Sequence, residues 1–513
     1  MAQAGILIFM IAYLVLMVVI GVYFSRRNRT VSDFYLGGRK LGPLVTAMSA
    51  EASDMSSYLL MGLPGLAYLS GLADVTWTAI GLAVGTYLNW LLTAKRLRRY
   101  SAAAGNAITI PEFFSNRYRD KKKILSLIAA AIIIVFFVPY TASGFAACGK
   151  LFRSLFNMDY HTAMLIAAAI IVVYTLLGGF LAASTTDLIQ SIVMTAALIA
   201  IIIFGVSCAG GWNAVMDNAS KLPGYLSMTL THDPATGAAG SYGPLTIVST
   251  LAWGLGYFGM PHILLRFMAI KDDSKLKTSR RIASVWVVIS MGIAILIGIV
   301  GLGMSANGVV PTLTGSDSET IIVQIANVLS KNGILAALLA GVALAGILAA
   351  TMSTADSQLL AASSAVSHDI VEGTFKRKLS DRINMLVARL TLIGIALVAL
   401  VFAWDPDSSV FTIVSFAWAG FGATFGPVMI FSLFWKRTTF WGALAGLISG
   451  GAMIFIWKFA VRPMGGAWDI YELLPAFIVA CVLIVVVSLL TKKPSQEIQD
   501  EFDSVKKSLK AKA

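Results

Sequence analysis

Two carboxylates, Glu51 and Asp54, interrupt a stretch that is otherwise apolar from residue 41 to 69, and four serine hydroxyls lie beside them between residues 49 and 57. If this stretch crosses a bilayer, the cost of burying a carboxylate predicts that both face the protein interior, a partner or a water-filled site. The small residues of this stretch and the Gly-Leu-Pro-Gly run at 62–65 predict a locally broken helix, which is tolerated where the freed backbone groups are buried in protein or line a cavity. Carbonyls, hydroxyls and a carboxylate are ligands for a hard cation, so we predict a cation site here.

The composition supports a membrane setting. Of the 513 residues, 58% are hydrophobic and only 13% are charged, whereas a soluble chain has about a quarter of its residues charged. Apolar runs of about 20 residues recur along the chain, which predicts an all-α polytopic protein embedded in the lipid bilayer with about 13 spans. We place these spans at 5–24, 42–67, 72–94, 124–147, 158–179, 186–207, 244–269, 281–304, 333–366, 385–403, 409–434, 439–460 and 473–491.

The net charge of +13 resides mainly in alternate loops. The basic loops are 26–29, 95–123, 271–281, 376–382, 436–437 and 492–493. The positive-inside rule puts them in the cytoplasm, which predicts an inner (plasma) membrane protein with its N-terminus outside and its C-terminus cytoplasmic. The same charge is not read as nucleic-acid binding. The first apolar run is too long for a signal peptide and is expected to be a retained span.

Spans two and seven both look broken, the second by the Gly- and Pro-containing run at 253–261. Paired broken spans at corresponding positions of two halves indicate inverted repeats around a midplane site. We expect a peripheral span and loop at 1–41, a first five-helix repeat at 42–207 and an extracellular connection at 208–243. A second repeat at 244–435, two peripheral spans at 436–491 and a cytoplasmic tail at 492–513 would complete the chain. A short helix outside the bilayer is expected within 316–332.

Several long motifs resemble the solute:sodium symporter family, in its sodium/proline symporter branch. They are the run 36–65, which opens Leu-Gly-Gly-Arg, the Trp-Gly-Leu-Gly-Tyr-Phe-Gly run from 253 with Pro-His at 261, and the segments 348–354 and 418–423. The resemblance extends over nearly all spans. It implies a leucine-transporter-like fold of five-plus-five inverted repeats, and a secondary symporter that imports L-proline with Na⁺ by alternating access.

The resemblance also implies a sodium site between the break of span two and span nine. The expected ligands are the backbone carbonyls of Ala52, Met55 and Ala350 and the hydroxyls of Ser353 and Thr354. Neighbouring hydroxyls on a helix rich in small residues suit a close helix–helix contact. The alternative for both hydroxyls is bonding to carbonyls of their own helix.

Three charged residues match family positions linked to coupling or gating. Asp54 is expected to couple sodium, with a structural cap of the unwound segment as its alternative. Asp187 also matches a sodium-linked position, and an ordinary charge at the start of span six is an equal alternative. Arg39, just before span two, matches a position near the inner gate, and its alternative is a charge that sets topology.

The substrate site is expected beside the sodium site. The resemblance places Ser56, Ser57, Tyr140, Trp253, Tyr257 and Pro261 around it. Freed N–H groups of a broken helix attract a carboxylate, and aromatic faces hold an apolar ring or a cationic amine. Aromatic residues in membrane helices also serve packing or interface belts, but the interleaved Gly and Pro residues favour the site.

The chain departs from the proline branch at Glu51, at Ser57-Tyr58, where Gly-Trp is typical, and at Met260, where Gln is typical. These changes touch the substrate side, so another small amino acid or a small carboxylate is an alternative substrate. The sequence has no HExxH helix, Walker loop or nucleophile elbow, so it does not predict an enzyme or an organic cofactor. An ion channel or a transporter-like sensor is the alternative from another class.

Overall fold

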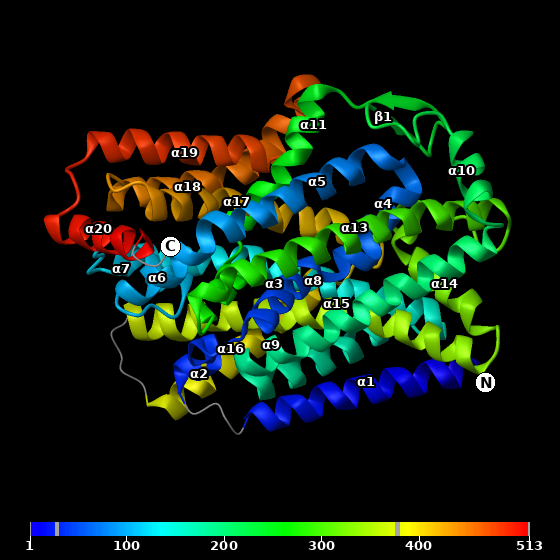
Figure 1. Cartoon of the computed structure of the whole chain (residues 1–513), viewed down its shortest axis with the longest axis horizontal. Coiled ribbons are helices and arrows are strands. Elements are labelled where there is room, and N and C mark those ends of the chain that lie inside the picture. The colour runs from blue at the N-terminus through cyan, green and yellow to red at the C-terminus, as the bar shows by residue number, and fades with distance from the viewer. Residues whose placement is uncertain (1, 26–29, 375–379, 511–513) are drawn as a thin grey trace.

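The computed structural model describes residues 2–25, 30–374 and 380–510, and the long helices run along the long axis of the molecule (Figure 1). Among the described residues, ten helices are long and apolar enough to cross a membrane. They lie in the elements α1 (Ala2–Ser25), α5 (Leu72–Leu88), α8 (Ile124–Phe156), α9 (Tyr160–Cys208), α13 (Leu276–Ala306), α15 (Ile334–Ser364), α16 (Asp381–Phe402), α17 (Val410–Phe434), α18 (Phe440–Ile456) and α19 (Leu473–Leu490).

The other three predicted spans are present as interrupted or merged helices. Predicted spans five and six form the single helix α9, which carries a non-helical Gly179 at φ 63° and ψ −173°. Only glycine adopts this conformation without strain, so Gly179 divides α9 near the predicted boundary. Spans two and seven consist of shorter pieces, which explains why length and apolarity alone find ten spans.

Predicted span two is broken at Ser56 and not at residues 62–65. Helix α3 (Pro43–Ser57) ends around Ser56, whose φ of 49° and ψ of −166° are non-helical. A π-helical turn, η2 (Tyr58–Gly62), then leads into α4 (Leu63–Ser70). The Gly-Leu-Pro-Gly run does not itself interrupt the helix, because Pro64 lies in the first turn of α4, where a missing N–H costs nothing and proline starts a helix.

Predicted span seven is also broken. It consists of α11 (Pro244–Leu251), the 3₁₀ segment η4 (Ala252–Phe258) and α12 (Pro261–Ala269), with extended backbone at Met260. Segment η4 packs directly on α5: a Cβ on Gly85 would lie 2.3 Å from the carbonyl oxygen of Gly254. Glycine is therefore required where these two backbones meet.

Helix α15 is the centre of the packing and contacts α1, α3, α8 and α9. Its run from Ala337 to Ser364 is rich in Ala, Gly and Ser, and nearly every side chain after Ala340 is buried. Small side chains allow neighbouring membrane helices to approach closely. The broken helix α3 is one of these neighbours, so the packing brings the polar part of α3 against α15.

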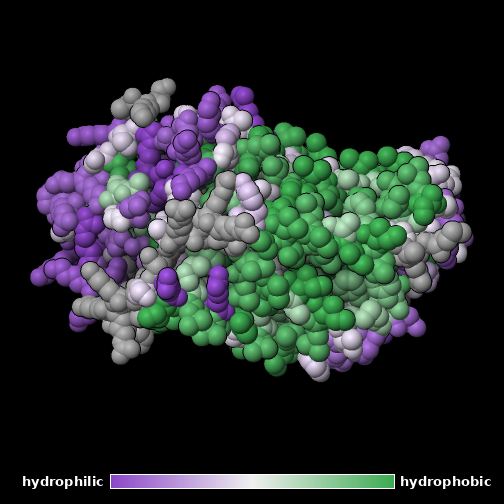
Figure 2. Space-filling view, turned by 90° about the horizontal axis from the view of Figure 1, so that it is seen from below, coloured by the Kyte–Doolittle hydropathy of each residue, from purple (hydrophilic) through white to green (hydrophobic). Residues whose placement is uncertain are grey.

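On the face that Figure 2 shows, hydrophobic side chains form a broad band with hydrophilic surface at both ends. The basic loops that the structure describes meet at one end, where Arg119 pairs with Glu501 at 2.7 Å and Lys436 pairs with Asp503 at 2.5 Å. Both acids lie on α20 (Gln496–Lys510), so the charged tail is a helix docked on this end (Figure 1). Residues 26–29 and 376–379 of the predicted basic loops lie outside the described residues.

Short elements complete the two ends. At the end that bears α20 lie α2 (Val31–Leu36), η1 (Gly37–Arg39), η3 (Asn89–Ala94), α6 (Lys95–Ala103), α7 (Ile110–Arg117), η5 (Asp273–Lys275) and η7 (Ala365–Thr374). At the other end lie α10 (Trp212–Ser220), the antiparallel strands β1 (Leu230–His232) and β2 (Ala239–Ser241), η6 (Gly315–Thr320), α14 (Ile321–Ser330), η8 (Trp457–Val461), η9 (Arg462–Met464) and η10 (Gly466–Trp468). The predicted helix within 316–332 corresponds to η6 and α14.

Candidate functional site

Four of the five groups predicted to bind sodium lie together where α3 meets α15. The Ser353 hydroxyl donates to the carbonyl of Ala52 at 2.8 Å and to that of Ala350 at 3.1 Å, and all three residues are buried. The Thr354 hydroxyl donates to the Ala350 carbonyl at 3.1 Å. Bonding within the helix, the alternative for these hydroxyls, therefore occurs, but Ser353 also bridges two helices.

The fifth group, the carbonyl of Met55, lies at the end of the regular part of α3 and accepts the N–H of Tyr58. Ser56, the first of the two residues between them, interrupts the helix, and its hydroxyl accepts a second bond from the Tyr58 N–H at 3.1 Å. Ser56 thus satisfies a backbone donor that the break releases. The capping role considered for Asp54 is filled by Ser56.

Asp54 connects the two broken helices. Its Oδ2 accepts a 2.5 Å hydrogen bond from the hydroxyl of Tyr257 in η4, and its backbone carbonyl accepts the hydroxyl of Tyr140 at 3.3 Å. The Asp54 side chain is 5% exposed, and its Oδ1 has no hydrogen-bond partner among the described residues. A buried carboxylate oxygen without a donor is costly, so this atom is a candidate contact for a cation or a substrate ammonium group.

Glu51, the departure from the family pattern, is also held inside the protein. Its Oε1 accepts the indole N–H of Trp90 at 3.0 Å, while Oε2 has no partner in the described part of the chain. Trp90 belongs to η3, the π-helical continuation of α5. The sequence reasoning missed this partner because the two residues share no motif.

Asp187 belongs to a buried polar cluster between α3, α9, α12 and α15. It accepts the hydroxyls of Ser49 at 2.6 Å and Ser53 at 3.1 Å, and a guanidinium N–H of Arg266 at 3.2 Å. The carboxylate is fully buried and lies eight residues beyond the Gly179 interruption of α9. The alternative of an interface charge at the start of a span is therefore wrong.

Arg266, which received no role from the sequence, organises this cluster. Its guanidinium donates to Ser49, Ser53, Asp187, Ser357 and the carbonyl of His262. Arg266 is 1% exposed. The available signal was its position as a single charge in the apolar run of α12, because an ionisable residue at membrane depth indicates a functional site by default.

The residues predicted to bind substrate fall into two groups. A polar cavity of about 10 Å³ is lined by Ser56, Ser57, Tyr140, Thr141, Ser143, Gly144, Thr351, Thr354, Ala355 and Gln358. This volume suits one water molecule or a small ion. Ser56, Ser57 and Tyr140 therefore line the same cavity as Thr354, in a space too small for an amino acid.

Aromatic rings form the second group, beyond the break. Trp253 stacks on Tyr58 with ring centroids 5.7 Å apart and on Tyr471 at 5.1 Å. Its carbonyl accepts the indole N–H of Trp418 at 2.8 Å. Tyr257 joins this group to Asp54, and Pro261 is the first residue of α12.

Arg39 lies at the end of the molecule that bears α20 and joins three segments. Its guanidinium donates to the carbonyl of Met268 at 2.7 Å, to the carbonyl of Ala107 at 2.8 Å and to the hydroxyl of Ser101 at 3.1 Å. Burial lowers the pKa of Arg39 to about 10, with the positive charge of Arg98 as a second cause. These contacts tie the entry of α3 to α12 and to the loop after α6.

Lys150 and Glu319 form a buried ion pair at the opposite end, with an N–O distance of 2.9 Å. The Glu319 carboxylate also accepts the backbone N–H groups of Val410 and Phe411 at 3.1 Å. A carboxylate at this position caps the first turn of α17 and is favoured by the helix dipole. The sequence reasoning missed this pair as well.

A family model described as the sodium:solute symporter family matches residues 34–450. The chain belongs to the sodium:solute symporter family. It is 43% identical over 488 residues to the high-affinity proline transporter PutP of Bacillus subtilis, covering 95% of this chain and 98% of that protein. It is 42% identical to a sodium/proline symporter of Haemophilus influenzae, covering 97% of each chain.

The solved structure of a Na⁺-coupled sialic acid symporter in a substrate-bound, outward-open state has the same fold. The TM-score is 0.77 at 18% identity, over 96% of this chain and 99% of that one. The leucine-transporter-like fold implied by the sequence resemblance is thereby confirmed, although the number of spans is not. The chain is a multi-pass membrane transporter, not an enzyme, and sodium is its coupling ion.

Proposed function

We propose that this protein imports L-proline together with Na⁺ by alternating access. The observation that carries the proposal is the contact of Ser353 on α15 with the Ala52 carbonyl at the break of α3. Relatives at 42–43% identity that are named as proline transporters supply the substrate. The transporter would act in the plasma membrane, without an organic cofactor or a nucleic-acid partner.

The sodium ion would bind to the carbonyls of Ala52, Met55 and Ala350 and to the hydroxyls of Ser353 and Thr354. The donor set fits a hard cation, which prefers several oxygen ligands. Ala52, Ala350, Ser353 and Thr354 are already linked by hydrogen bonds of 2.8–3.1 Å. Because the hydroxyl oxygens keep lone pairs when they donate, the same atoms can face an ion.

Asp54 and Asp187 would couple sodium to transport without being among these ligands. One carboxylate oxygen of Asp54 accepts the Tyr257 hydroxyl, and the other has no partner among the described residues. The oxygen without a partner would attract the entering sodium ion. Asp187 is neutralised by Arg266 in the adjoining cluster. It would act by holding Ser49 and Ser53, and thereby α3, in place.

The substrate would bind beside the sodium ion, among Ser56, Ser57, Tyr140, Trp253, Tyr257 and Pro261. Binding of proline would require the side chains around the break to move apart, because the cavity there holds only about 10 Å³. The freed backbone of the broken helices suits the substrate carboxylate. The aromatic faces suit its ring and its cationic amine.

We assign the end that bears α20 to the cytoplasm, because the described basic loops meet there. The N-terminus would then lie outside and the C-terminus inside. The two inverted repeats would span 42–207 and 244–435, with 1–41 and 436–491 as peripheral spans, 208–243 as the extracellular connection and 492–513 as the tail. Arg39 would serve the inner gate, since it joins the entry of α3 to α12.

Another small amino acid is the second candidate substrate. Ser57, which stands where the proline branch typically has glycine, lines the polar cavity at the break. Its hydroxymethyl group occupies space next to the proposed substrate and adds a hydrogen-bonding group that lacks a partner among the described residues. A substrate with a polar group that hydrogen-bonds to the Ser57 hydroxyl would bind more tightly than one without it.

The test is uptake of radiolabelled proline into proteoliposomes with and without an inward sodium gradient, with unlabelled amino acids and small carboxylates as competitors. Sodium-driven uptake that only close proline analogues inhibit is expected. If sodium drives uptake but another compound competes better, the sodium site stands and the proline assignment is wrong. Saturable proline uptake that does not depend on the sodium gradient, or an ion current without proline uptake, would overturn the symporter mechanism.

A further inference from the structure

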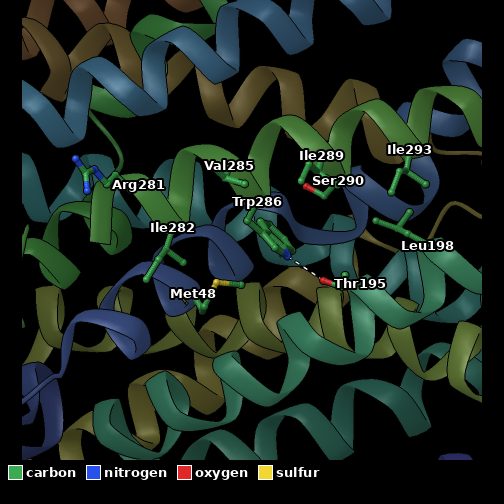
Figure 3. A pocket seen from close by; sticks show the side chains of 10 residues that line it. All are labelled: Met48, Thr195, Leu198, Arg281, Ile282, Val285, Trp286, Ile289, Ser290 and Ile293. Atoms are coloured by element: carbon green, nitrogen blue, oxygen red, sulfur yellow. Dashed lines mark hydrogen bonds between the residues drawn. The ribbon is translucent and has the colours of Figure 1, made fainter. Parts of the chain in front are cut away.

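An apolar groove lies on the flank of the bundle, between α13, the second half of α9 and the start of α3. Its volume is about 480 Å³, within the range of about 300–1,000 Å³ typical of ligand sites. Figure 3 shows the side chains that line it: Met48, Thr195, Leu198, Arg281, Ile282, Val285, Trp286, Ile289, Ser290 and Ile293. This groove lies apart from the polar cavity at the break of α3 and shares no lining residue with it.

The groove opens towards the membrane-facing surface. Val285 and Ile289, which line it, are 59% and 53% exposed. The polar groups in its wall are largely satisfied internally, since the indole N–H of Trp286 donates to the Thr195 hydroxyl at 2.9 Å and the Ser290 hydroxyl to the Val287 carbonyl at 3.2 Å. Such a surface is suited to hydrocarbon and offers little to a polar solute.

The one charged residue in the lining of the groove, Arg281, lies at one of its ends. Arg281 is exposed and makes no hydrogen bond or ion pair with any residue that the structure describes. In Figure 3 its guanidinium is at the end opposite Leu198 and Ile293. Arg281 also belongs to the basic start of α13, where Lys277 and Arg280 precede it. The end of the groove therefore has an unneutralised positive charge at the membrane surface.

The length of the groove matches one leaflet. From Arg281 to Ile293 the helix advances twelve residues, or about 18 Å at about 1.5 Å per residue. Half of a hydrocarbon core of about 30 Å is about 15 Å. A ligand whose headgroup lies at Arg281 would therefore place its chain along the groove as far as the middle of the bilayer.

We propose that this groove binds an anionic phospholipid of the leaflet on the basic side of the protein. The phosphate would pair with Arg281, since a guanidinium binds phosphate through two parallel hydrogen bonds. One acyl chain would lie along Val285, Ile289 and Ile293. Basic pockets between membrane helices on the basic side are suited to acidic headgroups.

The position of the groove connects the lipid to the transport machinery. Met48 forms part of the wall and directly precedes Ser49, which donates to Asp187. Thr195 lies on α9, two turns beyond Asp187. A bound lipid therefore supports α3 and α9 from behind the buried charge cluster.

The experiment measures lipid retention by native mass spectrometry. The full chain is purified in detergent and equilibrated with equal amounts of phosphatidylglycerol and phosphatidylcholine of identical acyl chains. The native chain is expected to retain one phosphatidylglycerol at least tenfold more often than phosphatidylcholine. Equal retention of the two lipids, or of neither, would overturn the proposal.

Substitutions separate the headgroup from the chain. Arg281→Gln is expected to abolish the preference for phosphatidylglycerol, and Arg281→Lys to keep most of it. Val285→Trp, which fills the groove but leaves Arg281 in place, is expected to lower retention of both lipids. Arg382→Gln removes an exposed charge near the start of α16, outside the groove, and is expected to change nothing.

Two further comparisons complete the test. Soluble glycerophosphoglycerol, the headgroup without chains, should not displace the lipid, whereas displacement would assign the site to a free phosphate compound. The unfolding temperature of each variant, recorded without added lipid, shows that it is folded. If Arg281→Gln retains phosphatidylglycerol as well as the native chain does, or if Arg382→Gln loses as much, the assignment to this groove is wrong.

Discussion

The buried pair of Asp187 and Arg266 gives a quantitative prediction about the stability of the fold. The two side chains are 0% and 1% exposed, and their charged atoms lie 3.2 Å apart. Breaking a buried ion pair by removing one partner costs about 3–5 kcal/mol, because the other charge is left without compensation. Removing both charges avoids that cost.

The hydrogen bonds around the pair rank the two single substitutions. In Asp187→Asn, Arg266 keeps four acceptors: the hydroxyls of Ser49, Ser53 and Ser357 and the carbonyl of His262. In Arg266→Gln, the donors that Asp187 keeps among the described residues are the two hydroxyls of Ser49 and Ser53. The arginine substitution should therefore lie at the upper end of the range of about 3–5 kcal/mol, and the aspartate substitution at the lower end.

The double variant tests this reasoning. If the two sites were independent, the losses would add to about 6–10 kcal/mol. We expect the double variant to lose no more than the worse single variant, which gives a coupling energy of about 3 kcal/mol. The free energy of unfolding would be measured by titration with a denaturing detergent in mixed micelles. Additive losses would show that the pair is not energetically coupled and would refute the account of the cluster.

Three further predictions follow from other contacts. Ser353→Ala and Thr354→Ala should each raise the sodium concentration for half-maximal uptake at least tenfold while leaving the ranking of competing substrates unchanged; equal loss of both properties, with the protein still in the membrane, would count against the sodium assignment. Ser57→Gly should alter the ranking of competitors and spare the sodium dependence, and an unchanged ranking would remove Ser57 from the substrate site. Gly85→Ala should lower the free energy of unfolding by about 1–3 kcal/mol through overpacking against Gly254. Gly292→Ala, where an added Cβ meets nothing within 4 Å, is its control and should cause no loss.

The buried carboxylates near the break of α3 could be predicted because charged residues are unexpected in an apolar run. Glu51 and Asp54 are carboxylates in an apolar run, whereas Ser353 and Thr354 were expected at the sodium site because of the family resemblance. Burial cost alone predicts that such carboxylates face the interior. The position of the break was not predictable in the same way, since a Pro-Gly pair can end one helix or start the next, and here it starts α4.

The partners of the buried charged residues could not be predicted from sequence patterns. Arg266 meets Asp187 from 79 residues away, and Lys150 meets Glu319 from 169 residues away. Neither separation reflects a helical or strand period, so only the packing of whole helices brings the charges together. The same holds for Glu51 on α3 and Trp90 on η3, which meet from 39 residues apart.

The two proposed sites share one movable element, and this has a thermodynamic consequence. Ala52, which accepts Ser353, and Ser57, which lines the substrate side, lie five residues apart on either side of Asp54. A sodium ion that holds the Ala52 carbonyl against α15 would order the break at Ser56, and substrate would then bind to backbone that is already ordered. Coupling of this kind is reciprocal, so the factor by which sodium raises substrate affinity must equal the factor by which substrate raises sodium affinity.

A typical coupling energy of about 1–3 kcal/mol corresponds to a factor of about 5–150 in each affinity. Equilibrium binding of labelled proline at several sodium concentrations, and of sodium at several proline concentrations, measures both factors on the same preparation. We expect them to agree within error, and we expect Ser353→Ala to bring both towards one. If the two ligands bind independently in the native chain, the break of α3 does not link the sites, and coupling must arise elsewhere in the fold.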